Sequence, residues 1–150
     1  MSEASPKANE ALAEAVREVL ETMFFACVYD EVEGVEAAGR IEARLGFAGQ
    51  WPGEFRLGIT PEAARGIAAG FLGVEDETEV SESQIGDVVC EVTNMVCGSA
   101  LSRLGADMAF DLEPPRLVAP DEAACQGGCA VRTFDLGNGT LTARIRFHRP

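Results

Sequence analysis

The chain has 150 residues, of which 47% are hydrophobic and 25% charged, so its size and composition are those of one soluble globular domain. Its formal net charge of −13 argues against nucleic acid and anionic lipid surfaces as partners, because both would repel it. No apolar run reaches the roughly 18 to 20 residues that a membrane-spanning helix needs.

The first residues are polar and acidic, unlike a secretory signal, and we therefore expect a cytoplasmic protein. The five cysteines are expected to be reduced thiols, because an odd count without a signal sequence is typical of a reducing compartment. The closest pair is Cys125 and Cys129, whose three-residue gap is not the usual zinc or redox spacing. We predict that this pair is dispensable, and a metal or redox role remains the alternative.

Residues 1–8 are expected to form a disordered tail, and residues 9–150 a single domain. The first predicted helix runs from about Asn9 to Tyr29, because apolar side chains recur on one face and acidic ones on the other. The apolar face consists of Leu12, Val16, Val19, Leu20, Met23 and Cys27.

Residues 40–47 and 54–59 alternate polar and apolar side chains, which predicts two half-buried strands. Thr60 and Pro61 predict the cap and the first turn of a second helix, which should end at Gly73. The side chains predicted to face the core from this helix are Ala64, Ile67, Ala68 and Phe71.

The longest predicted helix follows an acidic loop at residues 75–79. Ser81 and Gln84 have the spacing of a capping box at its start, and the helical pattern continues to about Leu104. Its apolar face should therefore cover much of the core.

The C-terminal third predicts strands. A short one is expected near residues 117–118, and a hairpin is expected from residues 131–136 and 141–147 around a Gly-Asn-Gly turn. The order of helix, two strands, two helices and further strands predicts an α+β fold in which an antiparallel sheet packs against long helices.

Polar residues form a stripe along one face of the longest predicted helix. Asp87, Glu91 and Asn94 are spaced i, i+4 and i+7, which places them within about 60° of each other, and Gly98 continues the line. Such a stripe is ordinarily a solvated helix face. Asn and Gly, however, cost roughly 0.5 and 1 kcal/mol relative to Ala inside a helix, and such local departures favour a functional site. The opposite, apolar face consists of Ile85, Val89, Val92, Val96 and Ala100.

Residues 83–98, SQIGDVVCEVTNMVCG, resemble the signature helix of the CheC, CheX and FliY chemotaxis phosphatases. The family motif is Asp or Ser, three residues, Glu, two residues and Asn, often followed by Met and then Gly. Asp87, Glu91 and Asn94 fit each motif position. The preceding helix and the order of elements also resemble CheX-like domains, so the resemblance covers most of residues 9–148. It implies a CheC-like layered fold.

The first predicted helix carries Glu14, Glu18 and Glu21 at the same spacing as the motif. CheC-type members carry the motif on two pseudo-symmetric helices. Because the last member here is Glu and not Asn, this copy is expected to be inactive. The chain therefore resembles CheX more closely than CheC.

The resemblance implies a phosphatase that removes phosphate from the phosphoaspartate of a CheY-type response regulator, with no covalent intermediate on this chain. The receiver domain supplies its own magnesium ion and lysine, so no cofactor of the chain's own is expected. By the same resemblance, Asn94 would orient the attacking water and Glu91 would pair with the receiver's lysine. Asp87 and Gly98 would contact the partner, and a homodimer is expected because CheX-like relatives dimerise.

Two alternatives remain open. A catalytically silent CheX-like module could bind a receiver domain or a flagellar-switch partner, but the intact set of Asp87, Glu91 and Asn94 favours the enzyme. A cysteine-based redox or metal module would depend on Cys125 and Cys129 alone. The single histidine, His148, is expected at the surface.

Overall fold

A computed structural model of the chain describes residues 6–33, 39–105, 109–120 and 129–148. Within these residues the chain forms three α-helices, one short 3-10 helix and seven strands. The elements are α1 (Pro6–Met23), β1 (Asp30–Val32), β2 (Ile41–Gly49), β3 (Gly53–Ile59), α2 (Pro61–Leu72), η1 (Glu77–Glu79), α3 (Glu82–Leu104), β4 (Phe110–Leu112), β5 (Arg116–Val118), β6 (Cys129–Asp135) and β7 (Thr140–Phe147).

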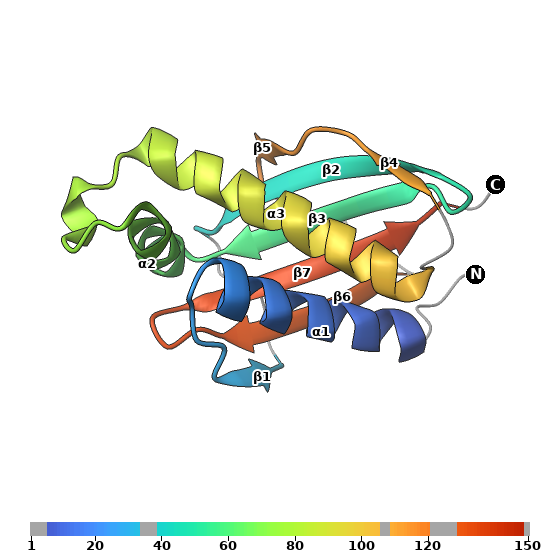
Figure 1. Cartoon of the computed structure of the whole chain (residues 1–150), viewed down its shortest axis with the longest axis horizontal. Helices are drawn as coiled ribbons and strands as arrows, with labels where there is room; N and C mark the ends of the chain where they lie inside the picture. Colours follow the sequence, from blue (N-terminus) through green and yellow to red (C-terminus); the bar gives the residue numbers. More distant parts are fainter. Residues whose placement is uncertain (1–5, 34–38, 106–108, 121–128, 149–150) are drawn as a thin grey trace.

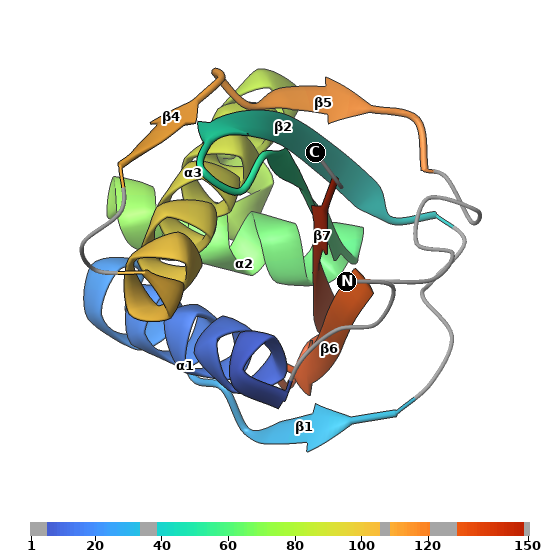
Figure 2. The ribbon, with the colours of Figure 1, turned by 90° about the vertical axis from the view of Figure 1, so that its right-hand side faces the viewer.

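The strands form one antiparallel sheet in the order β1-β6-β7-β3-β2-β4, and β5 also pairs with β2. The three α-helices lie on the same face of this sheet, and α1 and α3 lie side by side across it (Figures 1 and 2). This arrangement confirms the predicted α+β fold with an antiparallel sheet packed against long helices.

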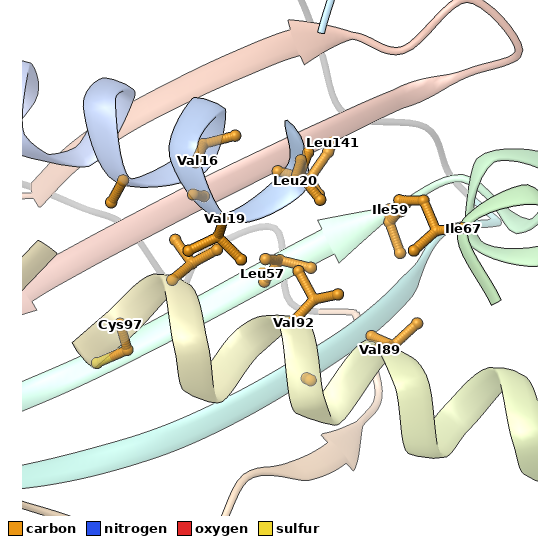
Figure 3. Close-up of a cluster of buried hydrophobic side chains, with 14 of the residues drawn as sticks. Val16, Val19, Leu20, Leu57, Ile59, Ile67, Val89, Val92, Cys97 and Leu141 are labelled. Atoms are coloured by element: carbon orange, nitrogen blue, oxygen red, sulfur yellow. The ribbon is translucent and has the colours of Figure 1, made fainter. Parts of the chain in front are cut away.

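The core lies between the helices and the three central strands, β2, β3 and β7. Because side chains alternate along a strand, every second residue of these strands is directed at the helices. Figure 3 shows apolar side chains from α1, α2 and α3 meeting those of β3 and β7. The buried apolar residues of these three strands are Ala43, Leu45, Phe47, Phe55, Leu57, Ile59, Leu141, Ala143 and Ile145.

The capping box at the start of α3 is confirmed. The Ser81 hydroxyl accepts a hydrogen bond from the Gln84 backbone N–H at 3.1 Å, and the Gln84 side chain accepts one from the Ser81 N–H at 2.9 Å. The predicted apolar face of α3 is also confirmed, because all five of its members are buried. No helix in the described part of the chain is long and apolar enough to cross a membrane.

The first helix differs from its predicted bounds at both ends. It begins at Pro6, so the last residues of the predicted tail are helical, while residues 1–5 lie outside the described part. It ends at Met23, and both Met23 and Cys27 are exposed. The apolar periodicity continues past the helix, but these two side chains are not directed into the core.

The second helix begins and ends as predicted, with Thr60 at its N-cap and Gly73 at its C-cap, but one predicted core residue is wrong. Phe71 is exposed, although helical spacing places it with the core residues. Thr60 occupies the N-cap position, but its hydroxyl makes no cap hydrogen bond and accepts one from the Thr140 backbone N–H at 3.2 Å. The side chain therefore joins α2 to the hairpin of β6 and β7.

Strands β1 and β4 were not predicted. Each has only three residues, which is too short for a period of two to be recognised. Each lies at one edge of the sheet, next to the longer strands β6 and β2. Short edge strands limit the backbone that is open to pairing with other chains.

A charged network lies on the sheet face opposite the core. Glu42, only 1% exposed, accepts a hydrogen bond from Arg40 Nε at 2.9 Å and another from Arg56 Nη1 at 2.6 Å. Arg144 Nη2 lies 3.4 Å from the same carboxylate. Glu54 extends the network: burial raises its pKa, but hydrogen bonds and charge from Arg56 and Arg44 outweigh burial and lower it overall. The Glu42 carboxylate of β2 thus binds arginines from β3, from β7 and from the residue just before β2.

The prediction of reduced thiols is wrong at one position. Cys129 is disulfide-bonded, whereas Cys27, Cys90 and Cys97 are free. An odd count of cysteines does not exclude a disulfide, which is why the count misled. Cys125 lies outside the described residues.

Candidate functional site

The polar stripe lies on the outer side of α3. Asp87 and Glu91 are exposed, and Asn94 and Gly98 are half-buried. In the part of the chain that the structure describes, the side chains of Asp87, Glu91 and Asn94 make no hydrogen bond or ion pair with the protein. Their polar atoms are therefore available to a partner, on a helix whose opposite face is fixed in the core.

The two glycines beside the stripe have different roles. A Cβ placed on Gly98 would meet nothing within 4 Å, so this position is open. A Cβ placed on Gly86 would lie only 2.9 Å from Cδ1 of Leu117, a half-exposed residue of β5. Gly86 therefore lets β5 pack against α3 and bring an apolar side chain beside the stripe.

The contact between Gly86 and Leu117 is not predictable from the sequence. It joins residues 31 positions apart, and neither local spacing nor composition reveals such a pairing. The one available signal was a second glycine inside a predicted helix, since an interior glycine often has a packing reason.

Two cysteines of α3 lie near the stripe, but neither has the character of a reactive thiolate. Partial burial, with a contribution from the charge of Asp87, raises the pKa of Cys90. Burial raises the pKa of Cys97 to about 12. A thiol must ionise to act as a nucleophile or to bind a metal, so the chemistry of this face depends on its carboxylates and its amide.

This difference predicts a fixed order of thiol modification at pH 8. Cys27 is exposed and should react first with an aromatic disulfide reagent, Cys90 should follow more slowly, and Cys97 should react only after unfolding. Mass spectrometry of peptides after timed quenching measures this order. Modification of Cys97 in the native protein at the rate of Cys27 would contradict the buried placement.

The motif-like glutamates of α1 are engaged within the protein. Arg103, near the end of α3, contacts Glu18 through Nη2 at 2.7 Å and Glu14 through Nη1 at 3.3 Å. This ion-pair cluster joins α1 to α3 at the surface. Two of the three side chains of the second motif copy thus have a partner within the protein, whereas the stripe on α3 has none among the described residues.

No group of three or more His, Cys, Asp or Glu side chains that could hold a metal ion occurs among the described residues. His148 is exposed, as predicted, and its Nε2 lies 3.9 Å from Glu54. The stripe on α3 is therefore the candidate site.

Comparisons with known proteins agree on one fold. The chain is similar to chemotaxis protein CheX from Vibrio vulnificus, with a TM-score of 0.75 and 24% identity over 96% of this chain and 97% of that chain. A chain of the CheX–CheY–BeF3–Mg2+ complex from Borrelia burgdorferi has a TM-score of 0.75 and 20% identity, over 93% of this chain and 97% of that chain. FliY from Thermotoga maritima has a TM-score of 0.61 and 16% identity, over 95% of this chain and 91% of that chain. No curated protein matches the chain in sequence.

These likenesses define the fold as that of the CheX and CheC-like chemotaxis proteins. Residues 41–135, more than half of the chain, match the family model described as chemotaxis phosphatase CheX. The chain belongs to the CheX chemotaxis phosphatase family. The matched range includes the whole of α3 and its polar stripe.

Proposed function

We propose that the chain hydrolyses the phosphoaspartate of a CheY-type receiver domain. The observation that carries this proposal is the stripe of Asp87, Glu91 and Asn94, which is free of partners within the described residues and lies on a helix fixed by its buried face. Family membership supports phosphatase activity, and the name of the Borrelia complex, which includes CheY, BeF3 and Mg2+, supports a receiver as the partner.

The reaction needs an ordered water more than it needs a nucleophile on the enzyme. The water oxygen bonds to phosphorus while the bond from phosphorus to the aspartyl oxygen breaks, which gives inorganic phosphate and a free carboxylate. An amide group both accepts and donates hydrogen bonds, so Asn94 can hold such a water in line with the breaking bond. The magnesium ion that neutralises phosphate charge belongs to the receiver.

Glu91 and Asp87 would act on the partner and not on the water. Glu91, one turn before Asn94, would form a charge-assisted hydrogen bond with the receiver's lysine and fix the position of the helix. Asp87, one turn further from Asn94, would make a contact at the rim, and the open position at Gly98 would let the receiver approach the helix.

Replacing Glu91 with Ala should therefore weaken receiver binding and also lower the maximal rate, because the ion pair exists in the bound complex and sets its register. Asp87→Ala should cause a smaller loss that decreases further at high salt. Initial rates of phosphate release at several receiver concentrations give both parameters. Glu10→Ala is the matched control, because it removes an exposed helical carboxylate of α1. A Glu91 variant with the affinity and rate of this control would contradict the assignment.

A homodimer and a cytoplasmic location remain predictions from the family resemblance and the sequence. The catalytically silent module remains the alternative function. It would bind the receiver with the same surface but leave the lifetime of the phosphoaspartate unchanged.

A further inference from the structure

An exposed apolar surface lies where the ends of α1 and α2 meet. Met23 and Phe25 come from the end of α1 and the segment after it, and Phe71 and Leu72 form the last turn of α2. These four side chains, here called the terminal patch, are 48%, 79%, 47% and 40% exposed, respectively. Grouped apolar side chains that a fold leaves exposed are typical of interaction sites.

The two segments are held together by packing. The buried ring of Phe24 lies against the ring of Phe71, with centroids 5.0 Å apart. A Cβ placed on Gly70 would lie 3.8 Å from the carbonyl oxygen of Phe24. The end of α1 lies beside α2 in Figure 1. The two segments that carry the terminal patch are therefore packed against each other.

Phe25 is unusual in its backbone as well as its exposure. Its φ is 55°, and it is the one non-glycine residue with a positive φ in the described part of the chain. This left-handed conformation ends α1, because it lets the Ala26 backbone N–H donate a hydrogen bond to the Leu20 carbonyl oxygen at 2.9 Å. The Phe25 ring itself gains no burial within the protein. The backbone conformation thus serves the end of the helix, whereas the exposed ring is left open to a contact outside the chain.

The two segments that supply the terminal patch are acidic in sequence. The sequence contains no Lys or Arg between Arg17 and Arg40, nor between Arg65 and Arg103, and these two segments supply the patch. Exposed carboxylates next to it in sequence are Glu21, Glu75 and Asp76. A second copy of the chain would bring like charges together, and an anionic membrane would be repelled. Charge complementarity instead favours a basic partner.

We propose that the terminal patch docks a basic amphipathic segment of a partner protein. Apolar side chains of that segment would cover Phe25 and Phe71, and flanking Lys or Arg side chains would meet the carboxylates next to the patch in sequence. This surface is built by α1 and α2, so the proposal does not depend on the phosphatase function assigned to α3.

The test uses the full chain and three fluorescent helical peptides. The first carries Leu on one face and Lys on the other, the second has Glu in place of Lys, and the third has Ser in place of Leu. Only the Leu/Lys peptide should bind tightly by fluorescence anisotropy. Phe25→Gly and Phe71→Ser should each lower its affinity about tenfold, as for central apolar residues of an interface. Val131→Ser, an exposed apolar residue of β6, is the control and should have no effect.

Phe25→Gly separates docking from folding, because Gly adopts a positive φ without strain. Its melting temperature should equal or exceed that of the wild type while peptide affinity falls. Equal binding of the Leu/Lys peptide to the wild type and both patch variants would overturn the proposal, because binding would then be electrostatic alone. A shift from dimer to monomer in the Phe25→Gly variant would also overturn it, since the occupant would be a second copy.

Discussion

Replacing Asn94 with Ala should lower the maximal rate of receiver dephosphorylation about 100-fold and leave receiver affinity nearly unchanged. A side chain that only orients the attacking water interacts mainly in the transition state, so its loss reduces kcat more than binding. Loss of positioning of this kind costs on the order of 100-fold. Stopped-flow phosphate release at saturating phosphorylated receiver measures kcat, and titration with a receiver activated by beryllium fluoride measures affinity.

The Asn94 variant should fold at least as well as the wild type, because Ala has the higher helix propensity and the side chain has no partner among the described residues. Ser102→Ala, which removes an exposed hydroxyl from the same helix, is the matched control. If Asn94→Ala retains the full rate, the assignment of this residue to the water is wrong, and the silent binding module becomes the better account.

Replacing Glu42 with Ala should give the largest loss of stability, about 3–5 kcal/mol of the free energy of unfolding. Its carboxylate is buried and contacts Arg40, Arg56 and Arg144, so the change removes the acceptor that three guanidinium groups share. Because a domain of this size has a total stability of roughly 5–15 kcal/mol, the variant should be close to unfolding at 37 °C.

Urea denaturation followed by circular dichroism measures this loss. Glu54→Ala is the control, because Glu54 also pairs with Arg56 and Arg44 but lies nearer to solvent, so its loss should be smaller. A decrease of less than about 1 kcal/mol for Glu42→Ala would show that the network is not a main source of stability.

The sequence was sufficient for the elements whose patterns are long and local. The capping box of Ser81 and Gln84 located the start of α3, and a 23-residue helix repeats its apolar spacing often enough to orient both faces. The positions of Asp87, Glu91 and Asn94 on one exposed side follow from the same geometry. A site on a single helix is therefore easier to recognise in the sequence than a site assembled from several loops.

Features set by contacts between distant segments were not predictable in this way. Helical spacing placed Phe71 in the core, but the core does not extend to the end of α2, and the ring remains exposed against Phe24. The packing of Leu117 on Gly86 and the pairing of Arg103 with α1 likewise depend on how the elements meet. Spacing determines which side chains share a face, but only tertiary structure determines what covers that face.

If this chain is a phosphatase, it must shorten the lifetime of a receiver phosphoaspartate, and this lifetime can be measured from the decay of the phosphate. A CheY-type receiver from the same genome is phosphorylated with a small-molecule phosphodonor, the donor is removed, and the remaining phosphoaspartate is followed with and without the protein in magnesium buffer. Decay should accelerate in proportion to substoichiometric amounts of the wild-type chain, and a variant that lacks both Glu91 and Asn94 should give no acceleration. Unchanged decay with the wild type, together with binding of the activated receiver, would contradict catalysis and leave only a binding function.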